Sequence, residues 1–104
     1  MSKILLKNTS KDSTIRKIAK NNGYCYNALK AIEELNELST SLVHSLTKST
    51  KSDTKDDIVE EFGDVLYRLS ILSNYFNIKK INDRISHKEK KSLKYLKDKR
   101  YDKV

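Results

Sequence analysis

The sequence contains no proline and only two glycines, Gly23 and Gly63, in 104 residues. Proline and glycine are the residues that most often end helices and form tight turns, so their scarcity favours long uninterrupted helices. Apolar residues also recur at intervals of three and four over residues 26–46 and 56–77, the spacing of one face of an α-helix. We therefore expect an all-α chain, because an all-β chain would need more turn residues.

Four helices are expected from this pattern. A first helix capped by Ser13 is predicted to stop at Gly23, since glycine adopts the left-handed conformation of a helix end at low cost. The polar segment TKSTKSDTK is predicted to be a loop between the second and third helices, with Thr54 or Asp56 as the cap of the third. The predicted helices cover about 13–22, 26–46, 56–77 and, more weakly, 82–100.

A chain of this length fits one domain, which we assign to residues 1–104, with a core over about 13–100 and a basic end, 88–104, that is expected to fray. Hydrophobic residues make up 37% of the chain and charged residues 35%. Because such a short, polar chain encloses only a modest core, the expected fold is a four-helix-bundle-type domain completed by a homodimer or a dimer of dimers.

Composition also bears on the compartment. No apolar run approaches the roughly 20 residues that cross a bilayer, and the apolar residues 4–6 are too few for a signal-peptide core. The single cysteine, Cys25, cannot form an internal disulfide. These features favour a cytoplasmic protein without a membrane partner.

The second and third predicted helices each carry a closely spaced pair of acids. Glu34 and Glu37, in the segment EELNE that begins at Glu33, are three residues apart, as are Glu61 and Asp64 in EFGD. A separation of three residues puts two side chains about 60° apart on a helix surface. In antiparallel neighbouring helices the two pairs can face one another, and such a cluster of oxygen ligands favours Mg²⁺, Mn²⁺ or Ca²⁺. The alternative interpretation is two solvated acidic helix faces.

Residues 28–78 resemble the MazG-like, all-α nucleoside triphosphate pyrophosphohydrolases. That family carries the pattern EExxE, a variable spacer and ExxD, and here 23 residues separate Glu37 from Glu61. The run Asp64-Val65-Leu66-Tyr67 is also similar to the family's Asp-Val-Leu-aromatic run. Small members of the family occur in phages and mobile elements, which suggests such an origin.

The resemblance implies hydrolysis of a nucleoside triphosphate to the monophosphate and pyrophosphate, with Mg²⁺ as the cofactor and Mn²⁺ as an alternative. The metal ligands that it implies are Glu34, Glu37, Glu61 and Asp64. It also implies that Glu33 is a supporting acid, and that Glu37 or Glu33 orients or deprotonates the attacking water. The substrate-binding side chains expected to follow the motif are Asn74, Arg84 and Lys88.

The charge distribution supports a different class of function. The net charge is +8, and residues 79–104 contribute +7 of it, with eleven Lys and Arg against four Asp and Glu. With Tyr95 and Tyr101 nearby, this segment could contact a nucleic-acid backbone, or it could be a solvated end. The alternative function is therefore a basic helical module that binds nucleic acid or protein without catalysis.

Overall fold

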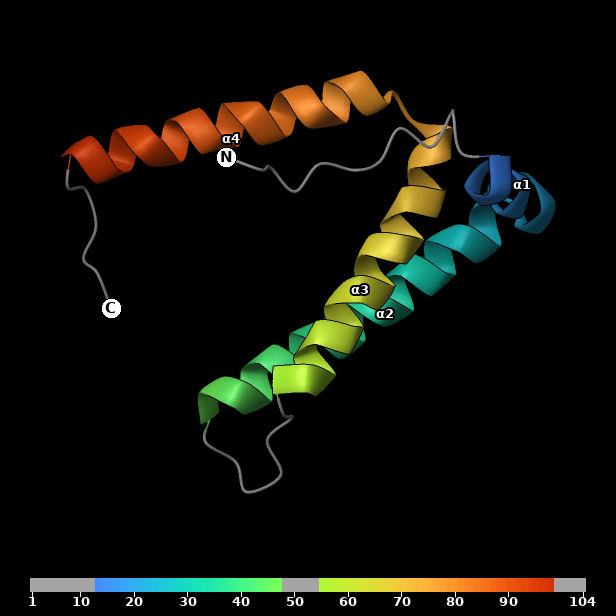
Figure 1. Ribbon diagram of the computed structural model, residues 1–104, viewed down its shortest axis with the longest axis horizontal. Coiled ribbons are helices and arrows are strands. Elements are labelled where there is room, and N and C mark those ends of the chain that lie inside the picture. Colours follow the sequence, from blue (N-terminus) through green and yellow to red (C-terminus); the bar gives the residue numbers. More distant parts are fainter. Residues whose placement is uncertain (1–12, 48–54, 99–104) are drawn as a thin grey trace.

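Two long helices lie side by side and run in opposite directions in the computed structural model of the protein (Figure 1). The structure describes residues 13–47 and 55–98. Within them the elements are α1 (Ser13–Asn22), α2 (Tyr24–Thr47), α3 (Lys55–Leu72), a short 3₁₀-helix η2 (Ser73–Tyr75) and α4 (Ile78–Asp98). This part of the chain contains no strand, so the all-α prediction and its four helices are confirmed. The predicted loop over 48–54, the Thr54 cap and residues 99–104 lie outside the described residues.

Gly23 separates α1 from α2, as the sequence predicts. Its φ of +83° lies in the left-handed region, where a residue with a Cβ is strained. The Gly23 amide donates to the Ala19 carbonyl at 3.1 Å, and its own carbonyl accepts from Asn27 N at 3.2 Å. One residue therefore ends the first helix and begins the second, at Tyr24 rather than at the predicted Tyr26.

A buried polar cluster holds the end of the hairpin where α1 packs. Asn27 is 1% exposed, and its Nδ2 donates to the Ala19 carbonyl at 3.1 Å and to the Tyr75 hydroxyl at 3.4 Å. The Tyr75 hydroxyl in turn donates to the Ala19 carbonyl at 2.7 Å. The Tyr75 ring also meets the Tyr24 ring edge-on, with centroids 5.1 Å apart. These contacts tie α1, α2 and η2 together.

The predicted third helix is too long and the predicted fourth begins too late. The structure ends α3 at Leu72 and begins α4 at Ile78, where the sequence predicted an end at Asn77 and a start at Asn82. Asn74 Nδ2 donates to the Ile71 carbonyl at 2.9 Å, which satisfies an acceptor at the end of α3. Asn77 Oδ1 accepts from Lys80 N at 3.1 Å and caps α4. Local side-chain hydrogen bonds therefore set this boundary.

The chain encloses little core. Among the described residues the buried apolar side chains are Ala19, Ala31, Val65 and Ile71. The main packing is between α2 and α3, α1 contacts both, and α4 leaves the hairpin instead of packing along it (Figure 1). The radius of gyration is 16.5 Å, against about 13 Å for a compact domain of 100 residues. One chain is therefore an open helical hairpin with two appended helices.

None of the helices in the described part of the chain is both long and apolar enough to cross a membrane.

Candidate metal centre

The antiparallel hairpin brings the two acidic motifs to the same level. The charge of Asp64 on α3 acts on Glu34 of α2, while Glu37 and Glu61 line one cavity between the same two helices. The residue numbers in each facing pair add to the same value, 98, as expected for two antiparallel helices in register. The predicted facing of the two pairs is thus present in the hairpin.

Glu34 lies where negative charges concentrate. Partial burial raises the pKa of its carboxyl, and the charges of Glu37, Asp64 and Glu33 raise it further. The Arg68 guanidinium acts in the opposite direction and lowers that pKa. Glu37 and Asp64 each raise the pKa by more than Arg68 lowers it, so the nearby positive charge does not compensate the carboxylates.

Glu37 and Glu61 share an open cavity of about 330 Å³. The hydroxyl of Ser41, a residue only 2% exposed, donates to Glu61 Oε1 across the helix interface. The cavity thus has one acid on each helix, and its other described lining residues are polar residues of α2. Its described lining consists of Asn36, Glu37, Thr40, Ser41, His44 and Glu61.

The acids fit a hard cation by their chemistry. In the described part of the chain, however, no three His, Cys, Asp or Glu side chains converge closely enough to form a ready-made metal cluster. Carboxylate oxygens are the ligands that Mg²⁺ prefers, and Mg²⁺ keeps several waters and commonly completes its shell with substrate phosphate oxygens. A centre of this kind needs few protein ligands at contact distance before substrate arrives.

The acids occupy one side of the hairpin and apolar side chains the other. On a helical projection of α2, with 100° per residue, Glu34 and Glu37 lie on one side of the buried residues. Leu35 and Leu42 lie on the opposite side. On α3, Glu61 and Asp64 are likewise separated from the apolar residues, here Val59 and Phe62, by the buried Val65. The hairpin therefore has an acidic face and an apolar face, and on the apolar face Leu35 and Phe62 are 44% and 43% exposed.

Glu33, predicted as a supporting acid, lies outside the cavity lined by Glu37 and Glu61. Its carboxylate pairs with Lys30 Nζ at 3.5 Å, and its side chain is 55% exposed. Its charge still contributes to the raised pKa of Glu34. Its catalytic role stays a prediction.

The three predicted substrate-binding residues are not beside the carboxylates in the single chain. The Asn74 amide donates to the Ser70 and Ile71 carbonyls at the end of α3. Arg84 and Lys88 are exposed on α4, which leaves the hairpin (Figure 1). Their roles stay predictions, and they require α4 to meet an acidic face from another direction or another subunit.

Sequence reasoning assigned no role to two residues of the centre. Ser41 follows Glu37 by four positions, and Arg68 follows Asp64 by four, so each shares a helix face with a motif acid. That spacing is the signal that could have identified them. His44, which is partly buried, also lies in the lining of the cavity.

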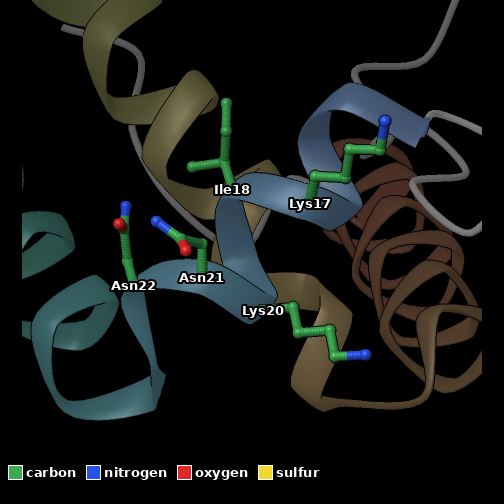
Figure 2. Close-up of a pocket in the computed structure, with 5 residues that line it drawn as sticks. All are labelled: Lys17, Ile18, Lys20, Asn21 and Asn22. Atoms are coloured by element: carbon green, nitrogen blue, oxygen red, sulfur yellow. The ribbon is translucent and has the colours of Figure 1, made fainter.

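A larger cavity, of about 710 Å³, lies against α1, and the described residues that line it are Lys17, Ile18, Lys20, Asn21 and Asn22. Figure 2 shows that the Lys17 and Lys20 side chains point in different directions, while Asn21 and Asn22 project from the other side of the helix. The two ammonium groups do not converge on one point, so the described lining residues do not form an anion site.

Comparisons with protein-family models, with curated proteins and with solved structures find no match to this chain.

Proposed function

We propose that the protein is a Mg²⁺-dependent nucleoside triphosphate pyrophosphohydrolase of the MazG-like type. The observation that carries this proposal is the pairing of the EELNE and EFGD motifs across one hairpin, with Glu34 under the influence of Asp64 and with Glu37 and Glu61 on one cavity. Uncompensated facing carboxylates destabilise a fold, so their presence supports a cation-binding role over a merely solvated face.

The proposed site divides into ligands and a water-orienting acid. The carboxylates that would hold Mg²⁺, or Mn²⁺ in its place, are Glu34, Glu37, Glu61 and Asp64. Bound there with the triphosphate, the ion would stabilise charge developing on the phosphate oxygens and lower the pKa of water. Between the two acids considered for orienting the attacking water, Glu37 is favoured over Glu33, because Glu37 lines the cavity and Glu33 is paired with Lys30.

The proposed reaction cleaves the bond between the α- and β-phosphates and releases a nucleoside monophosphate and pyrophosphate. The triphosphate needs positive charge, for which Arg84 and Lys88 are the proposed sources and Asn74 a proposed polar contact. Because α4 leaves its own hairpin, these cations are proposed to act with α4 in an assembled form of the protein.

That assembled form is proposed to be a homodimer built on the apolar face of the hairpin, with a dimer of dimers as the larger alternative. Pairing the apolar faces of two hairpins would give a four-helix core and leave both acidic faces outward.

Substitution of one acid on each helix tests the proposal. Glu37→Gln and Asp64→Asn should each lower Mg²⁺-dependent pyrophosphate release by at least about 100-fold, since each removes a charged ligand with little change of shape. Glu60→Gln is the matched control, because Glu60 is an exposed acid beside the motif and should keep wild-type activity. Wild-type rates in both motif variants would contradict the proposed site.

The exposed basic helix supports a second candidate, a nucleic-acid-binding module. α4 carries eight Lys and Arg against three Asp and Glu and does not pack along the hairpin. Duplex DNA binding that weakens steeply with salt and disappears on removal of residues 88–104 would favour this function. Mg²⁺-dependent pyrophosphate release by the full-length protein, without salt-sensitive DNA binding, would favour the hydrolase.

A further inference from the structure

A second line of mainly apolar side chains runs along the outside of α2. On a helical projection it lies next to Leu35 and Leu42, on the side further from α3. Its members follow one another at alternating intervals of four and three residues, which is the spacing of a helix-packing seam in coiled coils. We call this line the outer strip of α2, and its residues are Cys25, Leu29, Ile32, Asn36, Ser39, Val43 and Leu46.

The outer strip is uncovered in the single chain. Leu29, Ile32 and Val43 are each more than half exposed, and Cys25 is exposed as well. The proposed dimer pairs the neighbouring apolar face, so it leaves this strip at the edge of the four-helix core. Large contiguous apolar patches are rare on the surface of soluble proteins unless another surface binds there. α2 therefore has more apolar surface than α3 and an opposing hairpin would cover.

α4 also has an apolar side without a partner. Its apolar residues 78, 81, 85, 93 and 96 lie on one side of the helix, and Glu89 lies in the gap between them. Leu93 and Leu96 are 61% and 55% exposed, and α4 packs along none of the other helices in the described part of the chain (Figure 1). Both surfaces have apolar ends and a polar middle, formed by Asn36 and Ser39 in the strip and by Glu89 in α4.

Charge distinguishes between the possible pairings of these surfaces. α4 carries eight Lys and Arg against three Asp and Glu, so two copies of α4 repel one another. α2 carries three glutamates and one lysine, and Glu33 borders the outer strip with its side chain 55% exposed. Two outer strips placed together would therefore bring like charges together. Only α4 against the outer strip combines apolar contact with opposite charge.

We propose that α4 of one chain packs its apolar side on the outer strip of α2 in a second copy of the chain. The contact involves few side chains, too few to hold two proteins together alone, so it forms within the proposed dimer and adds to it. The proposal extends the assembly in the proposed function and rests on that dimer. It requires no hydrolysis of any nucleotide.

Photocrosslinking in the full-length protein tests which surface covers the strip, without assuming a register between the helices. The photoreactive amino acid p-benzoylphenylalanine replaces Ile32, and this protein is mixed with ¹⁵N-labelled wild type until the subunits have exchanged. Illumination followed by digestion and mass spectrometry should join the probe to ¹⁵N peptides from α4. The same probe in place of Tyr67 is the control, because Tyr67 is exposed on the other side of the hairpin and should capture no α4 peptide.

Variants of α4 test whether its apolar side makes the contact. Leu93→Glu combined with Leu96→Glu should abolish crosslinking from position 32, while sedimentation equilibrium still shows a dimer. Lys91→Gln combined with Lys94→Gln is the matched control, since it lowers the net charge by the same two units on the polar side of α4 and should keep the crosslink. Crosslinking that persists in the Leu93 and Leu96 variant would overturn the proposal.

A reciprocal experiment guards against loss of α4 itself in that variant. A probe in place of Leu93 should capture ¹⁵N peptides from α2, and Leu29→Glu combined with Val43→Glu in the ¹⁵N-labelled chain should abolish that capture. These two substitutions lie at exposed positions, so the buried core of the hairpin is unchanged. Capture that survives them would also overturn the proposal.

The other crosslinking outcomes are distinct from one another. Crosslinks to α2 of the second chain would replace the proposal with strip-to-strip pairing, and crosslinks to α4 of the same chain would replace it with folding back in one chain. A dimeric wild type without crosslinks would refute the docking alone, and a monomeric wild type would refute the dimer with it. Crosslinks to α4 of the second chain in a protein that cleaves no nucleotide would leave the docking standing and refute the hydrolase.

Discussion

At the scale of single residues, Glu34 connects stability to the site. A carboxyl whose pKa is raised in the folded chain is more easily protonated there than in the unfolded chain. Its protonated form therefore stabilises the fold at pH values below the ordinary pKa of 4.5, and this contribution is lost as pH rises through the folded pKa. At neutral pH, the charge on Glu34 opposes folding of the metal-free protein.

Glu34→Gln should accordingly raise the melting temperature of the metal-free protein at pH 7, because it removes a negative charge that is partly desolvated and is repelled by Glu37 and Asp64. The gain should shrink as pH falls through the raised pKa of the folded chain toward 4.5, because the wild-type carboxyl itself becomes neutral over that range. Thermal unfolding followed by circular dichroism across this pH range is the measurement. A variant less stable than wild type at pH 7 would contradict the account of this charge cluster.

The residue scale also shows how far spacing alone can identify a site. The three-residue separations within Glu34–Glu37 and Glu61–Asp64 were sufficient to place each pair on one side of its own helix, and the expected antiparallel packing of the two helices then allowed the pairs to face each other. The contact between Ser41 and Glu61 depends on how close α2 and α3 approach, and a serine in a helix carries no pattern that reports it. The approach of the two helices is a tertiary property.

At the scale of elements, the buried side-chain amide of Asn27 holds α1 against the hairpin. Asn27 donates from Nδ2 to both Ala19 and Tyr75 in a position that is 1% exposed. Asn27→Ala removes these hydrogen bonds and leaves space, so it should lower the free energy of unfolding by about 1–3 kcal/mol. Urea unfolding measures this loss, and Asn36→Ala, at an exposed position on the same helix, should cost much less. Equal effects of the two substitutions would argue against the buried cluster as the anchor of α1.

Helix boundaries were the least predictable part of the elements. Apolar periodicity located α2 and α3, and the glycine at position 23 located the end of α1. Periodicity continued past Leu72 to Phe76 and gave no indication that Asn74 and Asn77 would end one helix and cap the next. Polar caps act through single hydrogen bonds, which a repeat pattern does not record.

At the scale of the whole molecule, the open shape is the feature that needs explanation. In the proposed dimer, two copies of the hairpin would together form a four-helix core. The proposed dimer would also explain why one chain buries so few apolar side chains, since domains of this size often gain stability from association.

Phe62→Glu should convert the proposed dimer to monomers at micromolar concentration, because it places a charge in the middle of the proposed apolar interface. Tyr67→Glu is a close control, since Tyr67 is an aromatic residue of the same helix with 45% exposure against 43% for Phe62, and it faces away from both the apolar face and the hairpin core. Sedimentation equilibrium gives the mass of each variant. A monomeric wild type, or a Phe62→Glu variant that stays dimeric, would rule out this interface.

The central claim is that the acidic face supports cleavage of nucleoside triphosphates, and product analysis over a panel of ribo- and deoxyribonucleoside triphosphates tests it most directly. Incubation with Mg²⁺ followed by ³¹P nuclear magnetic resonance should show equal amounts of the nucleoside monophosphate and pyrophosphate from at least one nucleotide, and none after chelation of the metal with EDTA. Wild-type protein that cleaves no nucleotide with Mg²⁺ or Mn²⁺, or that releases a nucleoside diphosphate and orthophosphate, would contradict the account.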